Sequence, residues 1–240
     1  MKEIKSNLNK VFLIIIYILI FFVFSKLLYN ILVNMDFIND NPNLGNLLLN
    51  AIPYLILIIS GCILLKNEIV TDYKKLNKMD AMHVFIMCTV GIVFAYVANY
   101  IGSLISIMFG ANGQSENQAG INTFLTSEYG FLFIILTVFI GPVVEELVFR
   151  KSIHDVLRSY KLSNGMIIFI SSLLFGLIHV VNGGDYMFIF PYLLMGVVLG
   201  GLEMKSKNIY PCIFVHIFIN ALASIINIIM SNFEELLPVA

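Results

Sequence analysis

Long apolar runs separated by short polar stretches make up most of this chain. A helix that crosses the hydrocarbon core of a membrane needs about 20 mostly apolar residues. Runs of this kind lie at 11–33, 45–65, 82–109, 129–149, 163–182, 186–203 and 208–230. The pattern therefore predicts an all-α fold, a polytopic transmembrane helical bundle with about seven spans.

The basic residues test this prediction independently, because cytoplasmic loops of membrane proteins are rich in lysine and arginine. Thirteen of the 14 basic residues precede the first run or follow the second, fourth and sixth runs. The exception is Lys26 in the first run, whose long side chain is expected to reach the outer surface. We therefore expect a multi-pass protein of the cytoplasmic membrane, with its N-terminus cytoplasmic and its C-terminus outside.

The amino-acid composition is typical of a protein whose surrounding partner is membrane lipid. Hydrophobic residues make up 59% of the 240 residues and charged residues 12%, against roughly 25% charged in soluble domains. The net charge of −1 gives no reason to expect a nucleic-acid partner. Three parts are expected: N-terminal spans one to three at 1–128, a helical core at 129–230 and a short outer tail at 231–240.

Two segments between the runs receive structural predictions of their own. The segment 110–128 is rich in Gly, Asn, Gln and Ser and is expected to form a mobile outer loop. The segment 150–161 alternates apolar and basic residues and is expected to lie as a helix at the membrane surface.

Ionisable residues inside the spans are few, and each costs roughly 2.5–3.5 kcal/mol on insertion. They are Glu145 and Glu146 in the fourth run, His179 in the fifth and His216 in the seventh, joined by the amide of Asn220. Polar groups at such depth generally face the protein interior and take part in function. These residues are therefore the candidates for a functional site.

Their spacing on helices assigns different tasks to the two neighbouring glutamates. Adjacent residues point about 100° apart on an α-helix, so Glu145 and Glu146 cannot share one task. Glu146 and Arg150 are four residues apart with the acid first, which favours an ion pair. That pairing leaves Glu145 free.

The other two motifs repeat the four-residue spacing. Phe175 lies on the same helix face as His179, and His216 on the same face as Asn220. One histidine in a span most often packs helices together, and one glutamate–arginine pair is usually structural. The ordered occurrence of three polar faces on three spans favours a shared site.

A carboxylate, two imidazoles and an amide suit hydrolysis. A carboxylate withdrawn from water by lipid is a better base toward a water molecule near neutral pH. Histidine can orient that water or bind a metal ion. Histidine and asparagine donors can stabilise the oxyanion that forms when a carbonyl group is attacked.

At these residues the sequence resembles the CPBP family, which contains the CAAX proteases and bacteriocin-processing enzymes. The resemblance covers about 129–225 and rests on the motifs EELVFR at 145–150, FGLIH at 175–179 and HIFIN at 216–220. It implies an α-helical intramembrane endopeptidase acting on a peptide or protein substrate. CAAX-type lipidated C-termini, peptide pheromones and bacteriocin precursors are all substrates that the resemblance allows.

Carried over residue by residue, the resemblance implies a catalytic role for each polar group. Glu145 activates the water and His179 assists it, while His216 and Asn220 stabilise the oxyanion. The supporting residues complete the set: Glu146, Arg150 and Phe175.

The need for a metal ion is open at this point. Members of the family are commonly called metalloproteases, but a glutamate-activated water without metal is also proposed. The chain contains no HExxH zinc motif. A divalent metal such as zinc would require Glu145, His179 and His216 as its ligands.

Two readings compete with an enzyme. In an ion or proton transporter the same ionisable groups would carry charge across the membrane. A non-enzymatic bacteriocin-immunity or scaffold protein would have the same fold but would not hydrolyse a substrate. The basic face also suggests that a substrate reaches the site from the cytoplasm.

The predicted spans place the candidate residues at unequal depths. At about 1.5 Å per residue, Glu145 lies about 9 Å from the cytoplasmic edge, His216 about 12 Å and His179 about 20 Å. Helix tilt or a shifted boundary would have to remove this mismatch for the side chains to meet.

Overall fold

The structure, a computed structural model, describes residues 2–236 and the side chains of 7–231. Every regular element in this part of the chain is a helix. The elements are α1 (Lys2–Leu19), η1 (Ile20–Phe24), α2 (Ser25–Leu32), α3 (Asp36–Asn39), α4 (Pro42–Leu64), α5 (Lys66–Leu76), α6 (Ala81–Met108), α7 (Glu116–Leu125), α8 (Gly130–Ile134), η2 (Ile135–Ile140), α9 (Gly141–Glu145), η3 (Glu146–Ile153), α10 (His154–Ser159), α11 (Asn164–Val180), η4 (Tyr186–Phe188), α12 (Ile189–Ser206) and α13 (Ile209–Leu236). The first three η elements are π-helical and the fourth is a 3₁₀ turn. The all-α prediction is confirmed.

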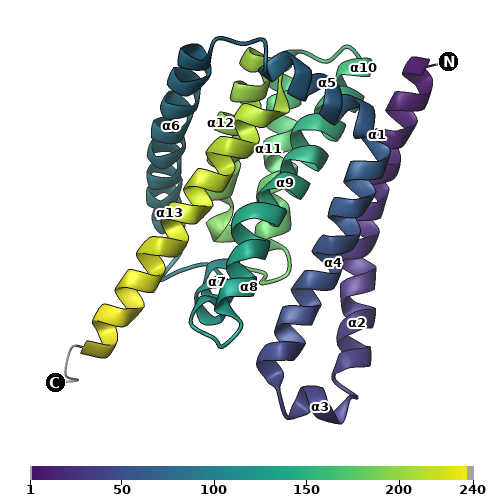
Figure 1. The fold of residues 1–240 in the computed structure, drawn as a ribbon. Coiled ribbons are helices and arrows are strands. Elements are labelled where there is room, and N and C mark those ends of the chain that lie inside the picture. Colours follow the sequence, from purple (N-terminus) through teal and green to yellow (C-terminus); the bar gives the residue numbers. More distant parts are fainter. Residues whose placement is uncertain (1, 237–240) are drawn as a thin grey trace.

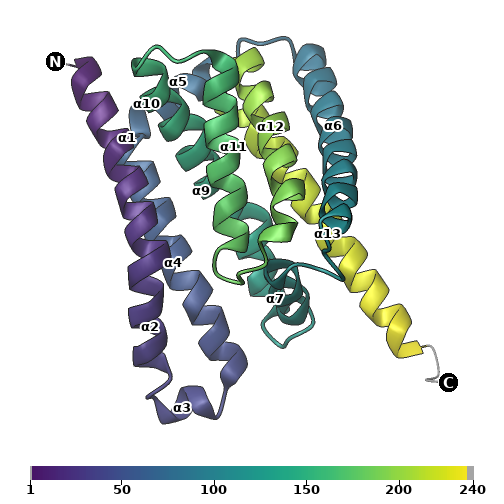
Figure 2. The same ribbon diagram turned by 180° about the vertical axis from the view of Figure 1, so that it is seen from behind.

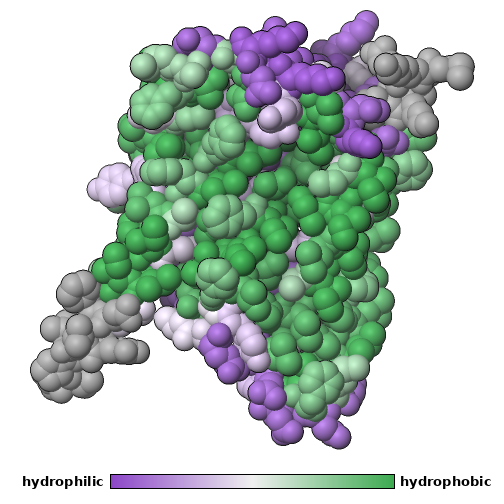
Figure 3. Space-filling model, viewed as in Figure 1, coloured by the Kyte–Doolittle hydropathy of each residue, from purple (hydrophilic) through white to green (hydrophobic). Residues whose placement is uncertain are grey.

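Six helices in the described part of the chain are long and apolar enough to cross a membrane. They are Asn7–Leu32, Pro42–Leu64, Ala81–Met108, Gly130–Ser159, Tyr186–Ser206 and Ile209–Ser231. The predicted fifth span corresponds to α11, an apolar helix of 17 residues. Figure 3 shows the resulting surface, a broad hydrophobic band between two hydrophilic ends. The chain is therefore an integral, multi-pass membrane protein.

The helices form two groups that meet at one end of the molecule. One group is a long hairpin in which α3 joins the continuous helix α1–η1–α2 to α4 (Figure 1). In the other group α12 packs between α6 and α11, and α13 crosses this layer (Figures 1 and 2). The helix that runs from α8 to α10 lies between the groups, with η3 against α1 and α9 against α4.

Gly196, which stands at GxxxG spacing with Gly200, allows α11 and α12 to pack closely. A Cβ added at Gly196 would lie 2.9 Å from the Ser172 Cα. Real Cβ atoms do not approach a backbone atom so closely, and a packed core resists the shift that would relieve it. The two backbones therefore touch because residue 196 has no side chain.

Replacing this glycine by alanine is expected to destabilise the protein by roughly 1–3 kcal/mol, because the added methyl group forces the two helices apart. Gly201 provides the matched control, since a Cβ there meets nothing within 4 Å. Gly201→Ala is expected to be neutral or to stabilise by up to about 1 kcal/mol through helix propensity. Thermal unfolding of both variants in detergent checks the pair, and equal melting temperatures would contradict this packing.

The segment 150–161 does not form a separate surface helix, contrary to the prediction from its basic residues. The fourth span continues without a break through η3 and α10 to Ser159. Arg150 is only 1% exposed, because its guanidinium pairs with Glu146 and lies 4.4 Å from the centre of the Phe175 ring. The charge that appeared to end the span is compensated inside the protein.

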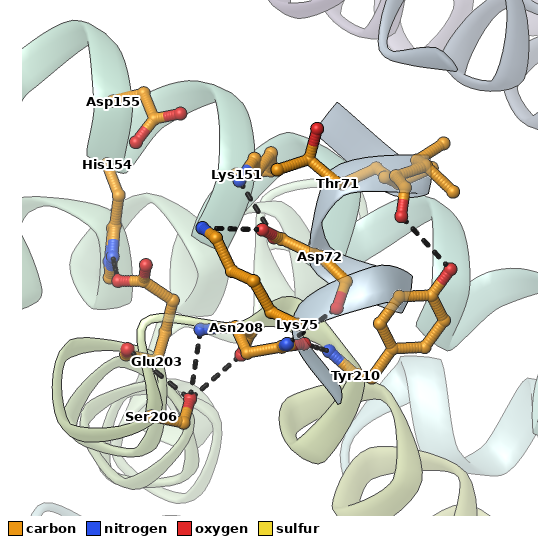
Figure 4. A network of polar contacts seen from close by, with 12 residues as sticks. Thr71, Asp72, Lys75, Lys151, His154, Asp155, Glu203, Ser206, Asn208 and Tyr210 are labelled. Carbon is orange, nitrogen blue, oxygen red and sulfur yellow. Dashed lines mark hydrogen bonds and ion pairs between the residues drawn. The ribbon is translucent and has the colours of Figure 1, made fainter. Parts of the chain in front are cut away.

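A network of ion pairs ties the helices together at the end that carries the basic residues (Figure 4). Buried Asp72 on α5 accepts hydrogen bonds from Lys75 at 3.3 Å and Lys151 at 2.8 Å. The Asn208 side chain donates to the Asp72 backbone carbonyl at 2.8 Å. Near this cluster, Glu203 on α12 contacts the His154 Nδ1 atom at 2.8 Å. The network fixes α5, η3, α10 and α12 relative to one another.

At the C-terminus, α13 continues as far as Leu236, so much of the predicted outer tail is helical. Residues 237–240 of that tail lie outside the described residues. The division at 128 stays a prediction, although α1 and α4 pack directly against the fourth span.

Candidate active site

A cavity of about 130 Å³ lies inside the bundle, and four candidate residues from three helices line it. They are Glu145, His179, His216 and Asn220. A water molecule needs only about 15 Å³ of comparable space. The structure thus brings together a carboxylate, two imidazoles and an amide around a space large enough for water molecules.

The predicted difference in depth disappears because the fourth span is longer than its apolar run. Glu145 lies about 21 Å before the end of the helix at Ser159, at about 1.5 Å per residue. His179 lies about 22 Å after the start of α11 at Asn164 on the same count. The two side chains therefore reach the same level of the bundle.

Irregular helix geometry surrounds Glu145. The short helix α9 that carries it lies between the π-helical segments η2 and η3. Pro142 has no N–H to donate, so the regular pattern of hydrogen bonds cannot pass through it. π-Helical turns of this kind occur frequently at functional sites. Glu145 is 7% exposed and faces the cavity.

His216 links the two glutamates. Its Nδ1 atom lies 2.8 Å from Glu146 Oε1, and its Nε2 atom lies 3.7 Å from Glu145 Oε2. A carboxylate can only accept a hydrogen bond, so Nδ1 carries the proton. The 3.7 Å separation is too long for a direct hydrogen bond and suits a pair of groups that share a water molecule.

The predicted ion pair between Glu146 and Arg150 is confirmed, with Arg150 Nη1 3.3 Å from Glu146 Oε1. Both side chains are fully buried. The second contact of Glu146, to His216, was not predicted, because it joins helices that are distant in the sequence. Glu146 therefore braces the fourth span and also orients an imidazole of the cavity.

His179 is held in one orientation by its own helix. Its Nδ1 atom lies 2.7 Å from the Phe175 carbonyl oxygen, which can only accept, so Nδ1 carries the proton. The imidazole also stacks on the Tyr192 ring, with centroids 4.5 Å apart and planes at 21°. Nε2 is left for a molecule in the cavity.

Asn220 is fixed by the helix opposite it. Its Nδ2 atom donates to the Thr137 carbonyl at 3.0 Å. This carbonyl belongs to η2, the π-helical segment that precedes Glu145. One amide N–H is therefore used to position the side chain, and the other remains for a ligand.

Sequence reasoning missed several polar residues that line the cavity, among them Tyr54, Asn117 and Tyr192. Tyr54 comes from α4, a span that carries none of the three motifs. A hydroxyl-bearing ring within a predicted span was the available signal for Tyr54 and Tyr192.

Asn117 belongs to α7, which replaces much of the predicted mobile loop. Ser115 caps this helix by accepting from Gln118 N, and its hydroxyl also lies 2.8 Å from the Tyr192 hydroxyl. Asp185 accepts from the backbone N–H of Glu116 at 2.8 Å. These contacts hold α7 against the cavity, at the end of the bundle away from the basic residues (Figure 1). The cavity extends toward that end, and the predicted approach of a substrate from the basic side stays a prediction.

The metal-binding interpretation depends on the donor set. No group of three His, Cys, Asp or Glu side chains among the described residues is placed to hold a metal ion. Glu145, His179 and His216 line one cavity without forming a coordination sphere. We therefore assign no metal ligands and derive no step through a metal.

Comparison with known proteins finds similarity in the segment that carries these residues. Residues 127–222 match the family described as type II CAAX prenyl endopeptidase Rce1-like. The matched segment contains Glu145, His179, His216 and Asn220. A Bacillus subtilis protein named "Putative membrane peptidase YdiL" is 31% identical over 128 residues, 53% of this chain and 49% of the relative. These matches support the resemblance of this chain to the CPBP proteases.

A second relative extends the similarity beyond the family segment. An uncharacterized protein of Mycoplasma capricolum subsp. capricolum is 32% identical over 233 residues, 88% of this chain and 66% of the relative. The chain thus covers just under two thirds of this relative and about half of the Bacillus subtilis protein. No solved structure matches the chain.

Proposed function

We propose that this chain is an intramembrane endopeptidase in which Glu145 activates a water molecule that hydrolyses a peptide bond. The observation that supports this most directly is the cavity, in which Glu145 and His216 Nε2 lie 3.7 Å apart inside the bundle. Glu145 takes a proton from the water, and the resulting hydroxide attacks the carbonyl carbon. The carbon–nitrogen bond then breaks, and the proton passes to the leaving amine.

The other cavity residues have complementary tasks in this proposal. The free N–H of Asn220 donates to the oxyanion. His216, oriented by its Nδ1 contact to Glu146, directs Nε2 toward the water beside Glu145. His179, with its proton on Nδ1, accepts from the water at Nε2 and helps to orient it.

The proposed substrate class comes from the resemblance to the CPBP family. A CAAX-type C-terminus, a peptide pheromone and a bacteriocin precursor all present a peptide bond at the membrane, with or without a lipid. Bacteriocin immunity by proteolysis would use the same reaction. The orientation with a cytoplasmic N-terminus also remains a proposal, supported by the basic residues at one end.

The test is cleavage of a membrane-peptide library by the purified full chain in lipid nanodiscs, read by mass spectrometry. His179→Ala is expected to lower the cleavage rate by roughly 100-fold or more, because it removes a group that positions the water. His83→Ala is the matched control, since His83 is exposed on α6 and outside this cavity. Equal rates for the wild type and His179→Ala would contradict the assignment.

The same preparation separates the competing functions. Proton or ion flux in vesicles without any peptide product would identify a transporter. Full biological activity of a variant without Glu145 would identify a binding or scaffold protein.

A further inference from the structure

A second hollow, of about 620 Å³, adjoins the catalytic cavity. Tyr54 and Asn117 line both spaces, so the hollow and the cavity meet at these two side chains. Its walls come from η1, α2 and α4 on one side and from α7 and the loop after α11 on the other. Figures 1 and 2 show the α1–α4 hairpin standing apart from α7 and α11 at this end of the molecule. We call this hollow the hairpin groove.

Several polar side chains interrupt the apolar lining of the hairpin groove. Its lining includes Ser25, Lys26, Asn30, Asn50 and Asn182. Polar side chains at such positions generally face a water-filled or ligand-binding space, because exposure to lipid is costly. The groove is therefore suited to binding a polar peptide chain.

Asn50 shows how the groove can hold a peptide backbone. Its Nδ2 atom donates to the Asn46 carbonyl of its own helix at 2.9 Å. This contact fixes the amide and leaves its oxygen as an acceptor on the groove wall. Asn50 lies one helical turn from Tyr54, at the junction with the catalytic cavity.

Lys26 is the only charged side chain that lines the hairpin groove. It makes no ion pair with any side chain in the described part of the chain, and no carboxylate lines the groove. The Lys26 side chain is exposed at the groove, so its ammonium group is accessible to a ligand. The groove thus offers one positive charge that the protein itself does not neutralise.

We infer that the hairpin groove receives one side of the substrate peptide and that Lys26 binds a carboxylate of that peptide. The inference rests on the proposed function and adds a specificity-determining residue to it. The carboxylate is either the α-carboxylate of the substrate or an Asp or Glu side chain. Either group matches the charge of Lys26 and the amide donors beside it.

The spacing along α1 and α2 sets the position of this carboxylate. Tyr17 packs against Phe149, which packs against Phe175 of the cavity wall, so Tyr17 lies near the level of the catalytic cavity. Lys26 lies about 14 Å further along the same helix at about 1.5 Å per residue. An extended peptide covers that distance in about four residues at about 3.3 Å each. The carboxylate is therefore about four residues from the cleaved bond.

The experiment compares three versions of one cleavable peptide. The first ends in a free carboxylate four residues after the cleaved bond, the second is amidated there, and the third is amidated but carries Glu at that position. Wild type is expected to cleave the two acidic peptides about tenfold or more faster, in kcat/KM, than the neutral one. A preference for only the first peptide would assign the α-carboxylate, and a preference for both would assign either source.

Two variants of the lysine complete the test. Lys26→Gln is expected to lose the preference, and Lys26→Glu is expected to prefer a peptide with Lys at the same position. Lys78→Gln is the matched control, because Lys78 is exposed and outside the hairpin groove. Retention of the acidic preference by Lys26→Gln would overturn the inference, as would equal cleavage of all three peptides by the wild type.

Two further measurements distinguish peptide binding at Lys26 from catalysis and from lipid binding. Binding of the three peptides to Glu145→Gln, with and without Lys26→Gln, is measured by fluorescence anisotropy and needs no cleavage. If the peptides bind in a Lys26-dependent way but the wild type cleaves none of them, the proposed function is contradicted. The assignment of the hairpin groove as a peptide-binding site would then still hold. Cleavage that follows the anionic lipid content of the nanodisc, and not the peptide charge, would assign Lys26 to a lipid headgroup and overturn the inference.

Discussion

Glu145→Gln is expected to lower the rate of peptide cleavage by about 10²–10⁴-fold, because an amide cannot take a proton from water. The substitution keeps the size of a side chain that is 7% exposed in the cavity wall. Loss of activity therefore reports chemistry and not a new space in the bundle. The rate constant is measured at saturating peptide in nanodiscs, beside the melting temperature of the same sample.

Glu203→Gln is the control for this substitution. Glu203 is another buried glutamate, 6% exposed, but its contacts are to His154 and Arg158 outside the cavity. It is expected to retain cleavage even if its stability falls. A Glu145→Gln variant that folds and still cleaves at the wild-type rate would rule out Glu145 as the base.

Arg150→Leu is expected to lower the free energy of unfolding by roughly 3–5 kcal/mol, because it leaves the Glu146 carboxylate buried without its cation. The same change removes the guanidinium from the Phe175 ring and from the Gly196 carbonyl, 3.4 Å from Nη2. Arg158→Leu is the matched control, since Arg158 is on the same helix but its side chain is 44% exposed. Its loss is expected to cost about 1 kcal/mol or less.

Denaturant unfolding in detergent compares the two arginine variants. The double variant Glu146→Gln/Arg150→Leu is expected to recover part of the lost stability, because no unpaired buried charge remains. If Arg150→Leu were no more destabilising than Arg158→Leu, the buried pair would not hold the fourth span in the way described.

Much of the fold could be predicted because apolar runs indicate the helices that cross the membrane, and the basic segments between them indicate where these helices end. The pairing of Glu146 with Arg150 was equally accessible, since it depends only on the geometry of one helix. The end of the fourth span could not be predicted, because an arginine such as Arg150 is typical of a membrane surface. Its burial depends on Phe175, which lies on another helix.

The candidate site shows the same limit. Local spacing identified the polar faces of His179 and His216, but not the contact from His216 to Glu146, which exists only after the helices pack. Tyr54 was missed because its helix has no motif. The helix α7 was missed because its polar composition is typical of a loop, whereas contacts from Tyr192 and Asp185 hold its first turn.

The central claim is that Glu145 directs a water molecule onto a peptide bond inside the membrane. Cleavage in ¹⁸O-labelled water, with the new carboxyl terminus analysed by mass spectrometry, tests it most directly. We expect the wild type to place one ¹⁸O atom in that carboxyl group, and folded Glu145→Gln to yield almost no product. Product without ¹⁸O, or the same amount of labelled product from Glu145→Gln, would contradict the account.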